Sequence, residues 1–159
     1  MSLKYRATKF DLANEIQVKA LMESAWNCKL HHFPHLFAVD WYAERDDKIK
    51  AFVEFKQRSF KSTERKIVHL NTAKKFWALS RFSYIAPAFF VVRFADGVVK
   101  FIDVSKVDDQ KREIAGEYNR WGPGKHDLEE MICVPIADMI ELKKPPRVIQ
   151  GASTTKGTK

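Results

Sequence analysis

The first half of the chain opens with a segment whose apolar residues have helical spacing. Leu12, Ile16 and Ala20 recur every fourth residue within residues 10–26, which is typical of one face of a helix. Asp11 can cap the start of that helix by accepting a hydrogen bond from a backbone N–H group. The pattern therefore predicts a helix over residues 10–26 with the Leu12 face turned toward the core.

Two apolar segments follow and predict a pair of strands. Residues 36–42 form a nearly unbroken apolar run, residues 44–48 are a polar turn, and residues 49–56 alternate in the manner of a strand. A short polar connection favours an antiparallel hairpin. In the second strand, one face carries Ile49, Ala51, Val53 and Phe55, and the other carries Phe52, Glu54 and Lys56.

The rest of the chain continues this alternation. The pattern predicts a basic loop over 57–66, a helix from Asn71 or Thr72 to Tyr84, strands over 88–94 and 98–104 joined by a turn at Asp96-Gly97, a short strand over 131–135, and one helical turn ending near Leu142. Residues 107–120 are polar and give a weak helical pattern. We expect an α/β (α+β) fold, with a mixed central sheet flanked by helices.

Composition and charge narrow the class of protein. With 159 residues, 45% of them hydrophobic, the chain is predicted to fold as one domain over residues 1–144, followed by a disordered basic tail over 145–159. Five of the 28 lysines and arginines and none of the 20 acidic residues follow Glu141, so residues 1–142 carry +3 of the net +8. A basic balance suits a polyanionic partner. The two cysteines and the absence of long apolar runs predict a reduced setting and no membrane span.

The charged residues inside the predicted hairpin are the best candidates for chemistry. Thirteen residues separate Asp40 from Glu54, and Lys56 follows on the same face as Glu54. Charges placed within apolar strands need a reason, and two carboxylates with the carbonyl of Phe55 offer the oxygen ligands that a hard divalent cation prefers. Lys56 is then placed to act as a base or to stabilise charge. The alternative is purely structural, with the acids capping turns or pairing with lysine.

Asp40, the thirteen-residue gap and Glu54-Phe55-Lys56, behind an N-terminal helix, resemble the PD-(D/E)xK nuclease superfamily, which includes restriction endonucleases, Holliday junction resolvases and small phage nucleases. Val39 stands where the superfamily often has proline. The resemblance implies an αβββαβ-type core over about residues 10–95. It also implies an endonuclease or exonuclease dependent on Mg²⁺ or Mn²⁺, of which an endodeoxyribonuclease is chosen, with Asp40 and Glu54 as metal ligands and Lys56 as the catalytic lysine.

The same resemblance implies further site residues and partners. Such nucleases often add an acid from the first helix, for which Glu15 and Glu23 are the candidates and Glu15 is chosen. DNA is the expected partner, a homodimer would cut two strands, and the expected location is the cytoplasm of a bacterial or phage-infected cell, beside the nucleoid. Basic residues that follow the motif are predicted to contact phosphates: Arg58, Lys61, Arg65, Lys66, Lys74 and Lys75.

Other interpretations have weaker support in the sequence. The cluster of His31, His32, His35 and Cys28 has the spacing of no common zinc site, so zinc is not expected there. A protein that binds nucleic acid without cleaving it, and a nuclease that acts on RNA, are the two alternative functions.

Overall fold

The computed structural model describes residues 9–118 and 126–144. Its helices are α1 (Lys9–Trp26) and α2 (Trp77–Phe82), and α2 continues a π-helical turn, η1 (Thr72–Phe76). The strands are β1 (Lys29–His32), β2 (Trp41–Arg45), β3 (Lys48–Gln57), β4 (Ile67–Asn71), β5 (Ala88–Arg93), β6 (Val99–Asp103), β7 (Arg112–Tyr118), β8 (His126–Pro135) and β9 (Ile140–Glu141). Two 3₁₀ turns, η2 (Val104–Lys106) and η3 (Ile136–Asp138), complete the described elements.

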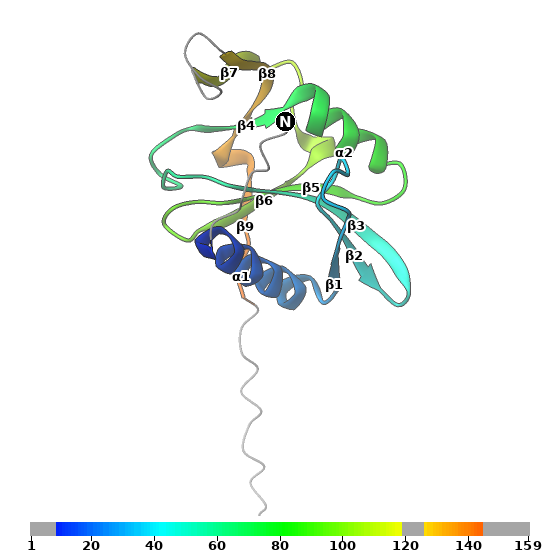
Figure 1. Cartoon of the computed structure of the whole chain (residues 1–159). Helices are drawn as coiled ribbons and strands as arrows, with labels where there is room; N and C mark the ends of the chain where they lie inside the picture. Colours follow the sequence, from blue (N-terminus) through cyan, green and yellow to red (C-terminus); the bar gives the residue numbers. More distant parts are fainter. Residues whose placement is uncertain (1–8, 119–125, 145–159) are drawn as a thin grey trace, which may run out of the picture.

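The strands form two sheets (Figure 1). The large sheet has the order β1-β2-β3-β5-β6-β9, and the small sheet has the order β4-β8-β7. Within the large sheet β3 and β5 run parallel, whereas the other neighbouring strands are antiparallel. The predicted hairpin is confirmed, because β2 and β3 pair antiparallel with Trp41 opposite Val53. The predicted class, a mixed sheet flanked by helices with an αβββαβ-type order, is confirmed. Strand β4 is an addition to that order, between the third strand and the second helix.

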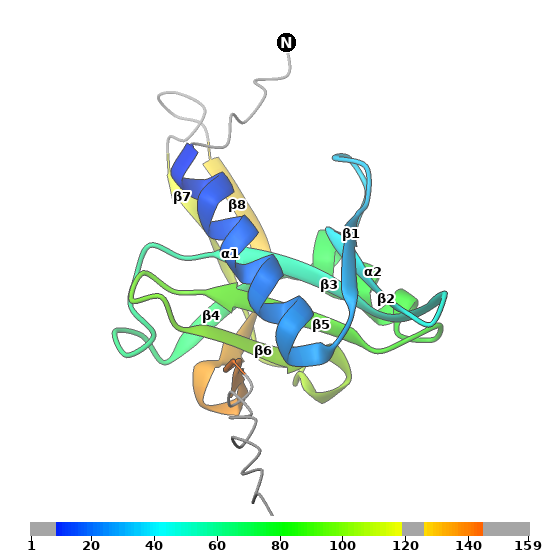
Figure 2. The same cartoon turned by 90° about the horizontal axis from the view of Figure 1, so that it is seen from below.

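The two helices lie on opposite faces of the large sheet (Figures 1 and 2). On the α1 face, Val18 and Met22 pack with Trp41 and Val53. On the α2 face, Leu79 joins a core with buried residues from both sheets, namely Phe52, Leu70, Phe90, Ile132 and Val134. Because both faces are covered, the middle of β3 is apolar on both sides, as is usual where helices flank a sheet. Any charge in that stretch is therefore buried.

Helix α1 exists where predicted, but its buried face was predicted wrongly. Leu12 is 49% exposed and Ile16 is 68% exposed, whereas Val18 and Met22 are buried. The helix has apolar residues on adjoining stripes, and spacing alone does not choose which stripe meets the sheet. Asp11 is not a cap, because the helix begins at Lys9.

The strand predicted over residues 36–42 is also largely wrong. Strand β2 begins only at Trp41, and the preceding residues form turns in which the Phe37 N–H donates to the carbonyl of Pro34 at 2.8 Å. Leu36 is 95% exposed, and Phe37 stacks on Phe33 with ring centroids 4.4 Å apart. The apolar run thus folds as a turn after Pro34, which lacks the N–H group that a strand ladder uses.

In the second half, most elements lie where the pattern placed them. The Asn71 side chain accepts a hydrogen bond from Lys74 N at 2.8 Å, so Asn71 caps η1 as predicted. Gly97 has φ +81° in the turn between β5 and β6, as the Asp96-Gly97 pair predicted. The weak helical pattern over 107–120 was wrong, because β7 occupies 112–118. Strands β4 and β1 were not predicted.

Some predictions fall outside the described residues. The basic tail over residues 145–159 is one of them, and so is any start of the domain before residue 9. Among residues 9–118 and 126–144, neither helix is long and apolar enough to span a bilayer.

Candidate active site

Asp40 lies where β2 begins and where β3 continues without a partner on that side. Its carbonyl accepts a hydrogen bond from the N–H of Phe33 at 2.9 Å, which fixes its backbone. Its Oδ2 accepts a hydrogen bond from the N–H of Phe55, also at 2.9 Å. The pairing of β2 with β3 ends at Trp41, which lies opposite Val53. Beyond that point the Asp40 carboxylate, and not a backbone carbonyl of β2, accepts the hydrogen bond from β3. Asp40 is thereby held beside the residue that follows Glu54.

The carbonyl of Phe55 points to the same side of β3 as Asp40. Backbone groups of successive residues alternate between the two sides of a strand. Phe52 donates its N–H to the carbonyl of Pro87 at 2.9 Å, on the β5 side. Phe55 is three residues further along β3, so its backbone N–H and carbonyl point to the opposite side. This is where its own N–H meets Asp40. A carbonyl oxygen and a carboxylate therefore occupy the same gap at the end of β2.

Glu54 is completely buried and is held between two lysines. Its Oε1 lies 3.2 Å from Lys56 Nζ and 3.0 Å from Lys75 Nζ, and Lys75 also donates to Oε2 at 3.1 Å. Burial raises the pKa of the Glu54 carboxyl, Lys56 and Lys75 oppose that rise, and the nearby charge of Asp40 adds to it. Although two ammonium groups are close to it, Oε1 accepts no well-directed hydrogen bond. Oε1 is therefore a buried acceptor that is held by the charges of the two lysines and not by a directed hydrogen bond.

Lys75 reaches Glu54 from the π-helical turn η1. Its Nζ also donates to the carbonyl of Ala38 at 3.3 Å, which ties η1 to the chain just before Asp40. Lys75 was predicted to contact phosphates, and its contact with Glu54 was not predicted. A signal existed, because Lys75 precedes the buried Leu79 by four residues and so lies on the inward face of the helix.

A cavity of about 430 Å³ opens beside these groups on the α1 side. Its walls include Glu15, His32, Asp40, Phe55 and Lys56. The structure thus brings Glu15 from α1 into the same cavity as Asp40 and Lys56. It places the other candidate acid elsewhere, since Glu23 accepts a hydrogen bond from Leu30 N at 3.2 Å.

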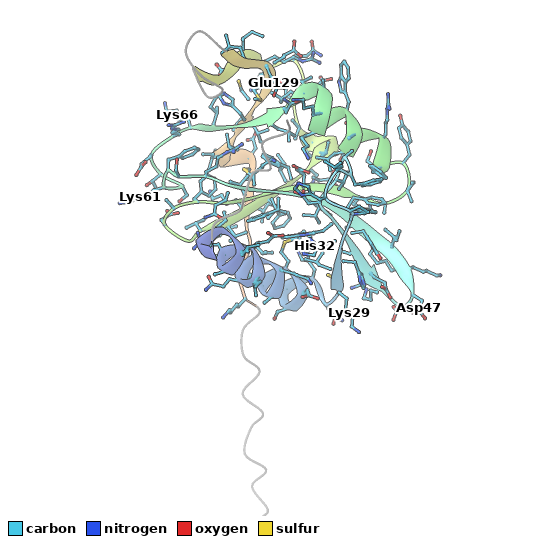
Figure 3. All side chains as sticks on the ribbon, in the orientation of Figure 1. Lys29, His32, Asp47, Lys61, Lys66 and Glu129 are labelled. Carbon is cyan, nitrogen blue, oxygen red and sulfur yellow. The ribbon has the colours of Figure 1, made fainter. Side chains whose placement is uncertain are left out.

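His32 is a cavity residue whose place was not predicted (Figure 3). Its Nδ1 accepts a hydrogen bond from Trp41 Nε1 at 2.8 Å and lies 3.8 Å from Glu15 Oε1. The indole nitrogen is only a donor, and its bond to Nδ1 fixes the His32 ring in the wall of the cavity that Glu15 also lines. The contacts of His32 differ from those of His31, which pairs with Glu44, so the two do not form a common zinc site.

The predicted phosphate-binding residues are spread over several environments. Arg58 is largely buried and donates to the carbonyl of His69 at 2.9 Å, and burial, with a smaller contribution from Arg65, lowers the pKa of its guanidinium. Arg65 lies over the ring of Phe60, 4.3 Å from its centroid. These two side chains already have partners within the protein.

Lys61 and Lys66 are exposed on the loop after β3, at the end of the molecule opposite the hairpin turn at Asp47 (Figure 3). Lys74 forms an ion pair with Glu129 of the small sheet. The structure thus separates the six predicted basic residues into exposed ones, internally paired ones, and Lys75 beside Glu54.

Comparison with known families identifies the chain. The model of the family described as "Phage putative PDDEXK endonuclease" matches residues 3–142. The chain belongs to this phage PDDEXK endonuclease family. The structure of Hjc, a Holliday junction resolvase from Archaeoglobus fulgidus, is similar with a TM-score of 0.48 and 14% identity, over 79% of this chain and 96% of that chain. None of the curated proteins matches the sequence.

In this PDDEXK endonuclease, the donor set beside Asp40 fits a hard divalent cation. Asp40 offers the oxygen that does not bond to Phe55, Glu54 offers the buried Oε1 without a directed hydrogen bond, and Phe55 offers its carbonyl. All are oxygen atoms, which Mg²⁺ and Mn²⁺ prefer. A cation would also offset the mutual repulsion of the two carboxylates, which otherwise raises the pKa of Glu54.

Proposed function

We propose that the protein is a Mg²⁺- or Mn²⁺-dependent endonuclease that hydrolyses phosphodiester bonds in DNA, with its active site at Asp40, Glu54, Phe55, Lys56 and Glu15. The observation that carries the proposal is the buried Glu54 carboxylate beside Asp40, where β3 continues past its last pairing with β2. Burial and charged neighbours are arranged to shift pKa values at active sites, so a buried acid with a raised pKa in contact with lysines is a candidate functional residue. Membership of the endonuclease family supports the same assignment.

Each proposed residue has a distinct role. Asp40, Glu54 and the Phe55 carbonyl are the metal ligands, and a bound divalent cation supplies positive charge to the phosphate and acidifies water. Lys56, whose ammonium lies 3.2 Å from Glu54 Oε1, donates to a phosphate oxygen or orients the attacking water at the cavity. Glu15 accepts a proton or binds a water across the cavity from Lys56.

DNA is the proposed substrate because of the charge of the protein. The chain carries a net +8, and the loop after Lys56 presents exposed Lys61 and Lys66. Lysines that neutralise phosphates supply affinity that does not depend on base sequence. The loop follows the active-site strand directly, so a backbone bound there continues toward Lys56.

The proposed nuclease is a homodimer. Exposed apolar side chains gather along and after α2, namely Trp77, Tyr84 and Ile85. Exposed apolar residues that cluster on a surface often mark a contact between proteins. Sedimentation of the purified protein, with Tyr84→Lys as the variant and Leu36→Lys as the control, tests it. A wild-type protein that sediments as a monomer at every concentration would contradict the dimer.

A cleavage assay tests the function and the site together. The protein is incubated with plasmid, linear duplex, single-stranded DNA, a four-way junction and single-stranded RNA, with Mg²⁺, Mn²⁺ or chelator. We expect cleavage of DNA only with metal, and a loss of about 10²-fold or more in Asp40→Asn, Glu54→Gln and Lys56→Met. Glu44→Gln and Lys50→Met are the matched controls, since Glu44 contacts His31 and Lys50 is exposed on the same strand as Lys56.

The outcomes separate the competing functions. Metal-dependent cleavage that persists in both Asp40→Asn and Glu54→Gln would contradict the site assignment. Binding without cleavage under all metal conditions would favour a non-catalytic nucleic-acid-binding protein. Faster cleavage of RNA than of any DNA would favour a ribonuclease. Faster cleavage of the junction than of the linear duplex would identify a structure-selective nuclease.

A further inference from the structure

The small sheet turns one face to the core and the other to solvent. In β4, Val68 and Leu70 are buried against Ile132 and Val134 of β8. Because side chains alternate along a strand, His69 lies on the outer face of β4. Cys133 of β8 is paired directly opposite His69 and lies on the same face. A histidine and a cysteine are therefore cross-strand neighbours outside the core.

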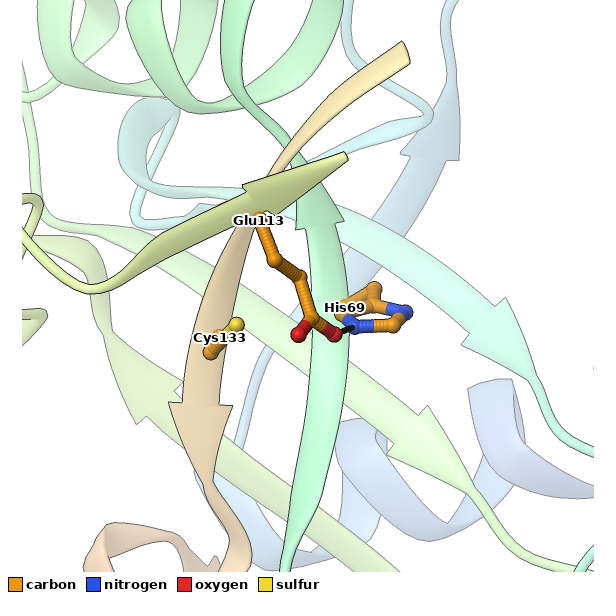
Figure 4. A group of neighbouring side chains, drawn as sticks. All are labelled: His69, Glu113 and Cys133. Atoms are coloured by element: carbon orange, nitrogen blue, oxygen red, sulfur yellow. Dashed lines mark hydrogen bonds and ion pairs between the residues drawn. The ribbon is translucent and has the colours of Figure 1, made fainter. Parts of the chain in front are cut away.

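Glu113 of β7 completes a cluster on this outer face. It is paired with Met131, which lies two residues before Cys133 and so shares its side of β8. The Glu113 carboxylate is in contact with His69 Nε2, and Figure 4 shows it between the imidazole and the Cys133 sulfur. One ligand atom from each of His69, Glu113 and Cys133 lies within 4.8 Å of the others. Three strands thus bring nitrogen, oxygen and sulfur atoms together.

The separations suit a small transition-metal ion. With Zn–N, Zn–O and Zn–S bonds of about 2.0–2.3 Å, ligand atoms of a tetrahedral site lie roughly 3.5 Å apart. The cluster therefore needs shifts of about 1 Å, which rotation of the Glu113 and Cys133 side chains can supply. Glu113 is exposed, so its carboxylate can rotate once it leaves its contact with His69, whereas the backbones of all three residues are fixed in paired strands.

The backbone around the cluster is already anchored. Arg58 donates to the carbonyl of His69 at 2.9 Å, and the N–H of Cys133 donates to the carbonyl of Lys111 at 2.8 Å. These contacts use backbone groups, so the imidazole, carboxylate and thiol contact only one another. The Asn71, Lys74 and Glu129 side chains on the same side of the small sheet bond to one another.

We propose that His69, Glu113 and Cys133 form a second metal site, specific for Zn²⁺ or a similar borderline ion and separate from the Asp40–Glu54 site. The proposal rests on donor chemistry, because a thiolate and an imidazole select zinc-like ions, whereas the oxygen atoms beside Asp40 select Mg²⁺ and Mn²⁺. Three protein ligands leave one position for water or for a ligand from a partner. The ion joins β4, β8 and the edge strand β7, so its first effect is to stabilise the small sheet.

Two other uses of these residues are less well supported. A nucleophilic cysteine is activated by a base or a positive charge beside its sulfur, but Figure 4 shows the Glu113 carboxylate between the Cys133 sulfur and the His69 imidazole. A simple His69–Glu113 ion pair requires no sulfur, yet Cys133 lies within the same cluster. A metal ion accounts for all three side chains.

Cobalt substitution tests the site by a signal that the nuclease site cannot give. Co²⁺ bound to a thiolate produces a near-ultraviolet charge-transfer band, whereas Co²⁺ bound only to oxygen atoms does not. We expect the wild-type protein and the Asp40→Asn/Glu54→Gln double variant to show the band, at one Co²⁺ per chain, and Zn²⁺ to abolish it. Cys133→Ser should lack the band, and Cys28→Ser, which removes the other free thiol, should keep it.

Glu113→Gln and His69→Ala test the two ligands other than the Cys133 thiol. Competition with a coloured chelator should give a Zn²⁺ affinity weakened by about tenfold or more for each variant. Zn²⁺ should raise the melting temperature of the wild type but not of these variants. A band that disappears in Cys28→Ser, a wild type with no thiolate band, or an unchanged Zn²⁺ affinity in Glu113→Gln would each overturn the proposal. The double variant separates this result from any failure of the nuclease assignment.

Discussion

Lys75 Nζ lies 3.0 Å from Glu54 Oε1 and 3.1 Å from Oε2, so a lysine from the crossover between β3 and β5 holds both oxygens of the most buried acid. Lys56 holds the same carboxylate from within β3. Two cations around one buried carboxylate oppose the rise in its pKa that burial causes. The geometry of the proposed active site therefore depends on a residue that lies outside the sequence motif.

Lys75→Met should destabilise the protein and impair the nuclease. Glu54 would lose a charged hydrogen bond inside the core, which costs about 1–3 kcal/mol and misplaces a metal ligand. We expect a lower free energy of unfolding in urea and a higher Mg²⁺ concentration for half-maximal cleavage. Lys74→Met is the neighbouring control, because Lys74 pairs with Glu129 at the surface, and such pairs contribute about 0–1 kcal/mol. Equal effects of the two substitutions would contradict the role of Lys75.

The pH dependence of cleavage should report Glu54. A protonated Glu54 cannot bind a metal ion, so cleavage should rise as pH increases through its raised pKa. Lys75 lowers that pKa, and removing it should therefore shift the acid limb of the profile to higher pH. The measurement is the initial rate against pH for wild type and Lys75→Met at saturating Mg²⁺. A shift to lower pH, or none, would refute this coupling.

Glu15 and Glu23 should respond in opposite ways to the same substitution. Glu15 lines the cavity with Lys56, so Glu15→Gln should lower the cleavage rate with little change in stability. Glu23 accepts a hydrogen bond from Leu30 N, and glutamine replaces this charged acceptor with a weaker neutral one, so Glu23→Gln should cost about 0.5–1.5 kcal/mol of stability and leave the rate nearly unchanged. Cleavage kinetics and urea unfolding on both variants check this. The reverse pattern would move the helix acid to Glu23.

Lys61 and Lys66 should contribute to DNA affinity through charge alone. Replacing both with alanine should weaken binding to every sequence and reduce the slope of the salt dependence by about one unit for each phosphate that is no longer neutralised. Lys48→Ala is the control, because Lys48 starts β3 directly after Asp47, and Figure 3 shows Asp47 at the end of the molecule opposite Lys61 and Lys66. Fluorescence anisotropy across a salt series measures the slope. An unchanged slope in the double variant would exclude these lysines from the interface.

The hairpin and the motif could be predicted because their signals are local. Glu54 and Lys56 alternate with Phe55 on one strand, so their shared face follows from the strand period. The polar pair Asp46-Asp47 marks the turn, and both residues have positive φ. Family membership over residues 3–142 agrees with the motif.

The features that could not be predicted depend on tertiary contacts. The exposed side of α1 could not be chosen from the spacing of Leu12 and Ile16, because the sheet selects the face that packs. The spacing of Lys75 from Leu79 indicates only that Lys75 faces inward, because its partner Glu54 lies on a different element and no local pattern predicts that pair. The cluster at His69 is similarly remote in sequence from Glu113 and Cys133, and only strand pairing brings the three together.

The parallel pairing of β3 with β5 affects how the active site forms during folding. The hairpins β2–β3 and β5–β6 have short turns and can form locally, whereas the parallel pair must close a loop that spans residues 58–87. Loop closure costs entropy before any contact offsets it. Lys75 lies inside that loop, so the Glu54 environment is completed only when the two hairpins join. In refolding, nuclease activity should therefore return with the slowest phase, after the signals of the separate hairpins.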